Sequence, residues 1–326
     1  MRVIPQPHSA ALPAQDGYVI QLSLAGLKAI TEYSPDSALV TVQAGATVDG
    51  FSDWLHDKHL AMACSPEGSG GLSLWEYFLS PEVGRFGPHF GSKWEQVLSM
   101  TAVLPNGRLF RNTASPGRSV GPDFSRPILM GRGRFGIPLE FTMKVHPKPP
   151  RREYLLLGYP SIEAALDSAW QLAQVVAPEF LEVGYSKQQG AESCWISMEL
   201  WGEGNRLSVR KERARKLAGA VGASSQFSMD SEPAAPGPMV HGTLQKEQAA
   251  ARIAELVGAN DAIELRARGF IDNQTCLLIS AAHNCIGLCS GSSSMHSSPD
   301  GEKMLASIAS KLDPEGIFSS VPLLWE

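Results

Sequence analysis

The sequence predicts an α+β protein built from two packed units. Its 326 residues exceed what one hydrophobic core usually contains, since domains commonly hold about 100–200 residues. Runs rich in β-branched residues alternate with segments of helical periodicity along the chain. A proline-rich basic stretch at 147–152 is typical of a junction between units. We therefore expect a first unit over 1–150, a second over 151–285 and a C-terminal segment over 286–326.

Strand and helix signals open the first unit. The runs 18–24 and 38–44 are rich in β-branched residues and end at turn residues, so both are predicted strands. Thr47 is placed to cap a helix, because a threonine side chain can accept a hydrogen bond from the first helical turn. The apolar residues of that helix fall at helical spacing: Val48, Phe51 and Leu55.

The rest of the first unit combines a glycine-bearing loop with a hairpin. Residues 65–92 carry many glycines, and long loops of this kind inside a domain are usually functional. Residues 97–104 have a strand pattern, and the turn signal at 105–107 predicts a β-hairpin with residues 108–110.

The second unit alternates strands and helices, which indicates a small α+β layer domain. Its expected elements are a strand over 154–157, a helix capped by Ser161, a strand over 194–200, a helix over 206–221, a mobile loop over 224–243, a helix over 245–257, and strands over 262–268 and 275–281. A last helix, starting at Ser298-Pro299, is expected to run to Leu312.

Composition excludes several classes of protein. The net charge of −5, with scattered basic residues, provides no positive field for nucleic acid. Five cysteines at irregular spacing favour a reducing compartment, so we expect a cytoplasmic protein. The start lacks a signal-peptide pattern, and no run approaches the ~18 apolar residues of a membrane span, so we expect no direct membrane insertion.

Five segments, in sequence order, match one superfamily: residues 40–45, 97–107, 121–124, 133–147 and 312–318. This set resembles the FAD-linked oxidases of the vanillyl-alcohol-oxidase, or PCMH, type. In particular it is similar to the flavoprotein subunits of glycolate oxidase, especially the smaller subunit. The resemblance implies a PCMH-type two-subdomain FAD-binding fold, a ferredoxin-like α+β cap, and a C-terminal segment that returns to the FAD-type domain.

The resemblance also implies where FAD is held, and there the first phosphate loop departs from the pattern. The family uses backbone N–H groups of glycine-rich loops, because glycine lets the chain approach the phosphates closely. Here the loop corresponds to residues 5–10, in which His8 and Ser9 are the candidate contacts. Pro5 and Pro7 stand where glycines are expected and supply no N–H, so two backbone contacts to the phosphates are expected to be lost.

The remaining predicted FAD contacts come from three later positions in the chain. A second glycine loop lies near residue 70, an aromatic-Gly-small step near residue 91, and a strand entry near residue 137. The bulky run Leu74–Leu79 follows the second loop and would occupy cofactor space where the family has small residues. The candidate residues are Pro66, Gly68, Gly70, Gly71, Phe90, Gly91, Ser92, Gly136 and Ile137.

Catalytic and metal residues are not identified by any pattern. A flavin oxidoreductase needs a base beside its substrate, but none of the eight histidines lies in a motif that assigns it this role. Cys285 and Cys289 suggest a metal or iron–sulfur ligand pair, yet such a site needs further ligands, with only Cys276 nearby. Buried or unpaired cysteines are the simpler interpretation, and we expect no metal site.

Two functional hypotheses follow, and both include a partner. In the first, the chain is the FAD-binding subunit of a complex that oxidises a small 2-hydroxy acid or alcohol, with a larger flavoprotein or iron–sulfur subunit as partner. In the second, it is a flavin-free scaffold for a catalytic paralogue. A lone small-molecule binding module is a third possibility, but it leaves the apolar ending at 321–325 unexplained.

Overall fold

The computed structural model describes fourteen stretches of the chain, which form two compact units. The described residues are 2–5, 19–63, 71–79, 86–91, 93–113, 124–131, 133–188, 191–223, 225–229, 240–245, 251, 263–271, 274–281 and 299–314. The first unit comprises Met1–Gly84, Ser92–Lys148 and Ser297–Glu326. The second comprises Arg85–Gly91 and Pro149–His296. A short piece of the N-terminal half of the chain thus belongs to the second unit.

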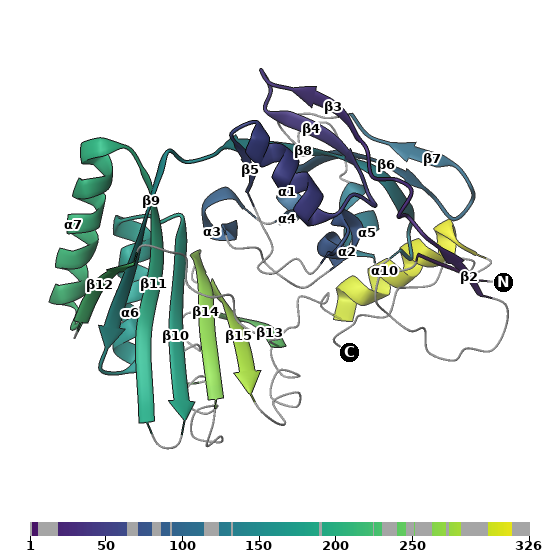
Figure 1. Ribbon diagram of the computed structural model, residues 1–326. Coiled ribbons are helices and arrows are strands. Elements are labelled where there is room, and N and C mark those ends of the chain that lie inside the picture. The colour runs from purple at the N-terminus through teal and green to yellow at the C-terminus, as the bar shows by residue number, and fades with distance from the viewer. Residues whose placement is uncertain are drawn as a thin grey trace. The chain divides into compact units, whose positions relative to one another are not determined.

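The first unit is built on an antiparallel sheet with the strand order β3-β4-β8-β6-β7, to which β5 is added beside β8 (Figure 1). A separate pair, β1 and β2, is parallel. The strands are β1 Arg2–Pro5, β2 Val19–Leu22, β3 Ile30–Ser34, β4 Leu39–Gln43, β5 Leu60–Met62, β6 Val97–Val103, β7 Leu109–Arg111 and β8 Ile137–Pro147. Buried Val40 and Val42 alternate with half-buried neighbours, so one face of the sheet carries the hydrophobic core.

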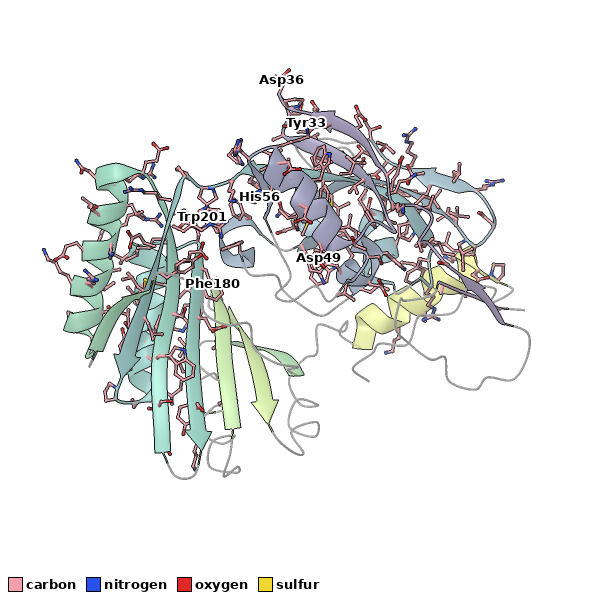
Figure 2. The ribbon with its side chains drawn as sticks, in the orientation of Figure 1. Tyr33, Asp36, Asp49, His56, Phe180 and Trp201 are labelled. Carbon is pink, nitrogen blue, oxygen red and sulfur yellow. The ribbon has the colours of Figure 1, made fainter. Side chains whose placement is uncertain are left out.

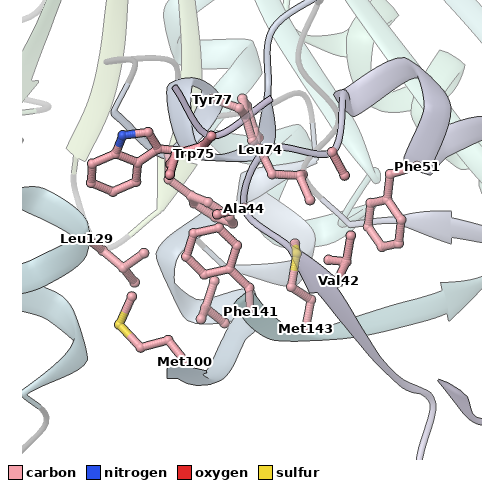
Figure 3. Packing of buried hydrophobic residues seen from close by; sticks show 14 of the residues in the cluster. Val42, Ala44, Phe51, Leu74, Trp75, Tyr77, Met100, Leu129, Phe141 and Met143 are labelled. Carbon is pink, nitrogen blue, oxygen red and sulfur yellow. The ribbon is translucent and has the colours of Figure 1, made fainter. Parts of the chain in front are cut away.

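The hydrophobic core of the first unit lies between that sheet face and the helices (Figure 3). Phe141 on β8 is fully buried, and its ring contacts the ring of Phe78 with centroids 4.9 Å apart. Ala309 of the C-terminal helix joins the same core, so that helix belongs to the first unit. The helices are α1 Val48–Asp57, α2 Leu74–Leu79, α4 Lys93–Gln96, α5 Ser125–Met130 and α10 Pro299–Leu312.

The predicted start of the first helix is confirmed. Thr47 has extended backbone angles, and its side-chain oxygen accepts a hydrogen bond from the Gly50 N–H at 3.2 Å. Val48, Phe51 and Leu55 are buried along one face of α1, as their spacing predicts. The cap and the apolar stripe thus specify this helix locally.

The second unit is a seven-stranded antiparallel sheet with the order β12-β9-β11-β10-β14-β15-β13 (Figure 1). Helices α6 and α7 pack against the same face of it, and their apolar residues form its core. Its strands are β9 Arg151–Tyr159, β10 Phe180–Gln188, β11 Ala191–Gly202, β12 Ser225–Met229, β13 Val240–Gln245, β14 Ile263–Ile271 and β15 Gln274–Ala281; its helices are α3 Gly87–Phe90, α6 Ile162–Val175 and α7 Gly204–Ala220.

Most elements predicted for the second unit are present, one prediction needs correction, and one strand was missed. The loop expected over 224–243 is wrong at both ends, because residues 225–229 and 240–245 pair into the sheet as β12 and β13. Strand β10 was not predicted at all. The helix expected over 245–257 lies almost entirely outside the described residues. None of the helices in the described part of the chain combines the length and the apolar character of a membrane span.

Candidate functional site

Six of the predicted FAD contacts lie outside the described residues: His8, Ser9, Pro66, Gly68, Gly70 and Ser92. The other five are described, and they do not belong to one unit. Gly71, Gly136 and Ile137 are in the first unit, whereas Phe90 and Gly91 are in the second. Each of the five is therefore tested against its own surroundings.

Gly71 has the surroundings that a glycine needs beside a bound group. Its φ of +82° lies in the region that disfavours other residues, and a Cβ built on it would meet no atom of the described residues within 4 Å. The chain that follows Gly71 is held in place: Val48 N–H donates to the Leu72 carbonyl at 2.9 Å, and Leu74 N–H donates to the Ala46 carbonyl at 2.8 Å. Gly71 thus combines a glycine-favouring conformation with a fixed backbone, and its contact with FAD stays a prediction.

Gly136 and Ile137 have a different environment. A Cβ on Gly136 would lie 3.1 Å from the Val103 carbonyl oxygen and 3.4 Å from Cγ2 of Ile128. Ile137 is buried and pairs with Val103 at the start of β8. The glycine here accommodates close packing of β8 against β6 and α5, so protein atoms fill the space directly above it.

The bulky run Leu74–Leu79 forms helix α2 in the hydrophobic core (Figure 3). Leu74, Trp75 and Tyr77 are at most 2% exposed. A capping box begins the helix: Ser73 N–H and Oγ both donate to Glu76 Oε2 at 2.7 Å, and Glu76 N–H donates back to Ser73 Oγ at 3.2 Å. These large side chains therefore serve the packing of the first unit.

A buried lysine lies beside the end of α2, and no sequence pattern indicated it. Lys93 is 1% exposed, and its Nζ donates to the Tyr77 carbonyl at 2.5 Å. The ammonium also lies 4.7 Å from the centroid of the Tyr77 ring and 5.0 Å from that of Trp94. A cation suits this place because carbonyl groups at a helix C-terminus carry partial negative charge.

A polar groove of about 780 Å³ lies on the first-unit sheet. The hydroxyls of Thr41 and Thr142 are 3.0 Å apart there, and Glu140 accepts a hydrogen bond from Thr101 at 2.8 Å. Arg111 is 3.5 Å from the same carboxylate. None of the five described FAD candidates lines this groove.

In the second unit, the ring of Phe90 lies beside that of Trp201 on β11, and Trp201 is labelled in Figure 2. The rings of Phe90 and Trp201 have centroids 5.6 Å apart. Gly91 has a φ of +88°, so the aromatic-Gly step contains a backbone conformation that other residues rarely adopt. The step predicted to face the cofactor is thus attached to the cap sheet.

Three buried carboxylates lie in the second unit, and sequence reasoning missed them. Glu179, Glu182 and Glu199 are at most 6% exposed. Glu199 accepts from the Trp201 indole N–H at 2.5 Å and lies 3.5 Å from Arg152, while Glu179 pairs with Arg210 at 3.0 Å. The signal was a single acid between apolar residues of a strand, as in Leu181-Glu182-Val183 and Met198-Glu199-Leu200.

Metal ligands do not cluster in the described part of the chain, where no three His, Cys, Asp or Glu side chains are arranged to hold an ion. Cys285 and Cys289 lie outside the described residues. Cys194, on β11, is a buried free thiol. Burial raises its pKa to about 12, which keeps the thiol protonated and unreactive near neutral pH.

About half of the chain is similar in sequence to known proteins. Residues 3–113 match the family described as FAD binding domain. D-lactate dehydrogenase [cytochrome] 1 of Saccharomyces cerevisiae is 26% identical over 165 residues, which are 50% of this chain and 28% of the yeast protein. A probable D-lactate dehydrogenase of Danio rerio is 25% identical over 169 residues, which are 49% of this chain and 33% of the fish protein. The aligned part thus spans about a third or less of these relatives.

A further protein is similar in sequence, and a solved structure is similar in fold. Alkyldihydroxyacetonephosphate synthase of Caenorhabditis elegans is 23% identical over 149 residues, 46% of this chain and 25% of that protein. A solved structure of an alkyldihydroxyacetonephosphate synthase superimposes with a TM-score of 0.76 at 14% identity, covering 97% of this chain and 71% of the other. The family match supports FAD as the cofactor, as predicted. Residues 3–113 are thus similar to the FAD binding domain of FAD-linked oxidoreductases, and the chain shares the fold of a solved alkyldihydroxyacetonephosphate synthase.

Proposed function

We propose that this chain is the FAD-binding subunit of a glycolate-oxidase-type complex that oxidises a small 2-hydroxy acid and passes the electrons to a partner subunit. The observation that carries the proposal is the match of residues 3–113 to the FAD binding domain family, over a segment that contains Gly71. In FAD-linked oxidoreductases, bound FAD accepts a hydride from the substrate.

The substrate class and the route of the electrons rest on the named relatives. Three of them are called D-lactate dehydrogenase [cytochrome], and lactate is a 2-hydroxy acid. That name indicates a cytochrome rather than oxygen as acceptor in those proteins. A larger flavoprotein or iron–sulfur subunit would take the electrons from this chain.

Each unit contributes a residue that could contact a bound group. The open side of Gly71 would let the cofactor approach a backbone that hydrogen bonds with residues 46–48 keep in place. In the cap, the Arg152 side chain is 27% exposed and pairs with the buried Glu199 at 3.5 Å. Its pairing with Glu199 leaves it oriented but partly neutralised.

A flavin-free scaffold is the second candidate, and specific observations favour it. Pro5 and Pro7 stand where the family has phosphate-binding glycines, so two N–H donors are missing. Each hydrogen bond to a charged phosphate is worth about 1.5–3 kcal/mol, so losing two would weaken FAD binding roughly a hundredfold or more. Close packing also fills the space above Gly136. Such a chain would keep its fold as a surface for a catalytic paralogue.

One experiment separates the two. The protein is purified from its native host with its partners, and the flavin of each subunit is quantified from the absorption spectrum. FAD on this chain that is bleached anaerobically by glycolate or D-lactate supports the oxidoreductase subunit. A chain without flavin, associated with a flavinylated paralogue, supports the scaffold. A lone, fully flavinylated monomer that reduces oxygen contradicts both.

A further inference from the structure

The aromatic-Gly segment packs on the second unit, where helix α3 lies against β14 and three of its rings contact the indole of Trp201. Trp201 contacts three rings of the segment Phe86–Gly91: Phe86 at 4.7 Å between centroids, Phe90 at 5.6 Å and His89 at 6.4 Å. Phe86 is 5% exposed. Tilted and edge-on aromatic pairs of this kind add about 0.5–1.5 kcal/mol each to area burial. The segment is thus anchored through its side chains, far along the sequence from its partner.

Other residues of the second unit contact the ring face, the indole N–H and the backbone of Trp201. Its indole N–H donates to Glu199 Oε1 at 2.5 Å, and the Arg152 guanidinium carbon lies 5.3 Å from its ring centroid. Its backbone N–H donates to Glu179 Oε2 at 2.9 Å, and its carbonyl accepts from Arg210 at 2.7 Å. Buried ionised groups are costly unless they are paired, so this network strongly favours one orientation of the indole.

We infer that Trp201 is a positioning residue that fixes the segment Phe86–Gly91 on the cap and thereby sets the backbone of the cofactor-facing step. The inference rests on the proposed function for the role of Phe90 and Gly91 at the cofactor. The anchoring itself rests on the ring contacts alone. The step belongs to the second unit, so its anchoring is a property of that unit by itself.

Two hydrogen bonds give a direct measure of the anchoring. The His89 and Phe90 N–H groups both donate to the Phe86 carbonyl at 3.0 Å, so their hydrogen exchange reports whether the segment is held. The affinity for FAD is measured in parallel by titration of the full-length protein. The first readout does not require FAD, so the anchoring is tested even where the proposed function fails.

The variants are Trp201→Ala, Trp201→Phe and Phe86→Ala, with Trp195→Phe as the matched control. Trp195 is on the same strand and the same sheet face, and its ring lies over Gly184. We expect Trp201→Ala to accelerate exchange at His89 and Phe90 at least tenfold and to raise the Kd for FAD at least tenfold. Trp201→Phe should have smaller effects than Trp201→Ala on the exchange rates and on the Kd for FAD. A ring remains in this variant, while the hydrogen bond to Glu199 is lost. Trp195→Phe should change neither.

Phe86→Ala provides a second test in case the Trp201 variant does not fold, because it removes the Phe86–Trp201 ring contact while Trp201 is kept. It should reproduce the faster exchange, and its effect should be less than additive with that of Trp201→Ala. Unchanged exchange in folded Trp201→Ala would overturn the anchoring. Faster exchange with an unchanged Kd for FAD would overturn the link to the cofactor. A wild-type chain that binds no FAD contradicts the proposed function, and the exchange data then decide the anchoring by themselves.

Discussion

Arg210 holds the buried carboxylate of Glu179 at two points, with Nη1 3.0 Å from Oε1 and Nη2 3.2 Å from Oε2. The same guanidinium donates to the Trp201 and Ala177 carbonyls, each at 2.7 Å. Ala177 has a φ of +48°, so this contact also secures a strained turn. One side chain of α7 thereby ties together the helix, the sheet and the turn after α6.

Arg210→Leu is expected to lower the free energy of unfolding by about 3–5 kcal/mol, because Glu179 is left buried without its cation. Arg210→Lys should lose less of the free energy of unfolding than Arg210→Leu but should not match wild type, since an ammonium cannot make the two-point contact. Urea denaturation measures both. Lys216→Leu is the control: the pair of Lys216 with Glu212 is exposed and should contribute no more than about 0.5 kcal/mol. Equal losses in the two leucine variants would contradict the prediction.

The core of the second unit predicts a loss of stability in alkali. Burial raises the pKa of Cys194 from an ordinary 9.0 to about 12. Burial, with a contribution from the Glu192 carboxylate, raises the pKa of Tyr185 from 10.0 to about 12. Between pH 9 and pH 12 the unfolded chain therefore releases protons that the folded chain keeps, so the unfolded state is favoured as pH rises.

Stability from these two groups is thus complete below about pH 9 and declines above it. Cys194→Ala should flatten the decline, because one of the two groups no longer titrates. Denaturant midpoints of wild type and variant, compared on either side of pH 9, measure this. A variant with the same alkaline slope as wild type would show that the thiol does not contribute.

The capping box of α2 is expected to matter more than an ordinary cap. Ser73→Ala removes the hydroxyl that bonds Glu76 in both directions, and caps are worth about 1 kcal/mol. Because Glu76 is only 5% exposed, we expect Glu76→Ala to cost more, about 1–3 kcal/mol. Thr47→Ala, at the exposed cap of α1, provides the comparison in the same denaturation experiment. A Glu76→Ala loss no larger than that of Thr47→Ala would show that burial adds nothing.

Gly136→Val is expected to destabilise the first unit through packing. The new side chain would press on the Val103 carbonyl, 3.1 Å from the Cβ, and on Ile128. Overpacking of this kind costs about 1–3 kcal/mol. Thermal melting without added FAD is the measurement. An unchanged melting temperature would show that β6 and β8 accommodate the side chain.

Gly71→Ala separates backbone strain from cofactor contact. At its φ of +82° alanine costs roughly 1–2 kcal/mol, although the space around it is open. Gly107→Ala is the matched control, since that glycine has a φ of +76°, open space and a place in the β6–β7 hairpin turn. We expect similar losses of stability, but a higher Kd for FAD only in Gly71→Ala. Equal FAD binding by the two variants would remove Gly71 from the cofactor site.

Local signals determined much of the fold. The alternation around Val40 and Val42 was sufficient to place β4, and Thr47 was sufficient to start α1, because both signals act within a few residues. The turn at 105–107 likewise identified the β6–β7 hairpin. The order of five short motifs indicated the likeness to FAD-linked oxidases and their cofactor, which the family match supports.

Tertiary contacts decided the rest. Strand β10 carries Gly184 in its middle, which weakens any strand pattern, yet a Cβ there would meet the Trp195 ring at 2.2 Å, so the glycine makes room for the neighbouring strand. Phe86–Gly91 joins the second unit because its partner is Trp201, a residue that no local pattern links to it. By itself the sequence determined many of the elements and the likeness to FAD-linked oxidases, since propensity and capping are local. Only the tertiary structure decided which glycine has space beside it and which unit holds the aromatic step, because both depend on atoms distant in the chain.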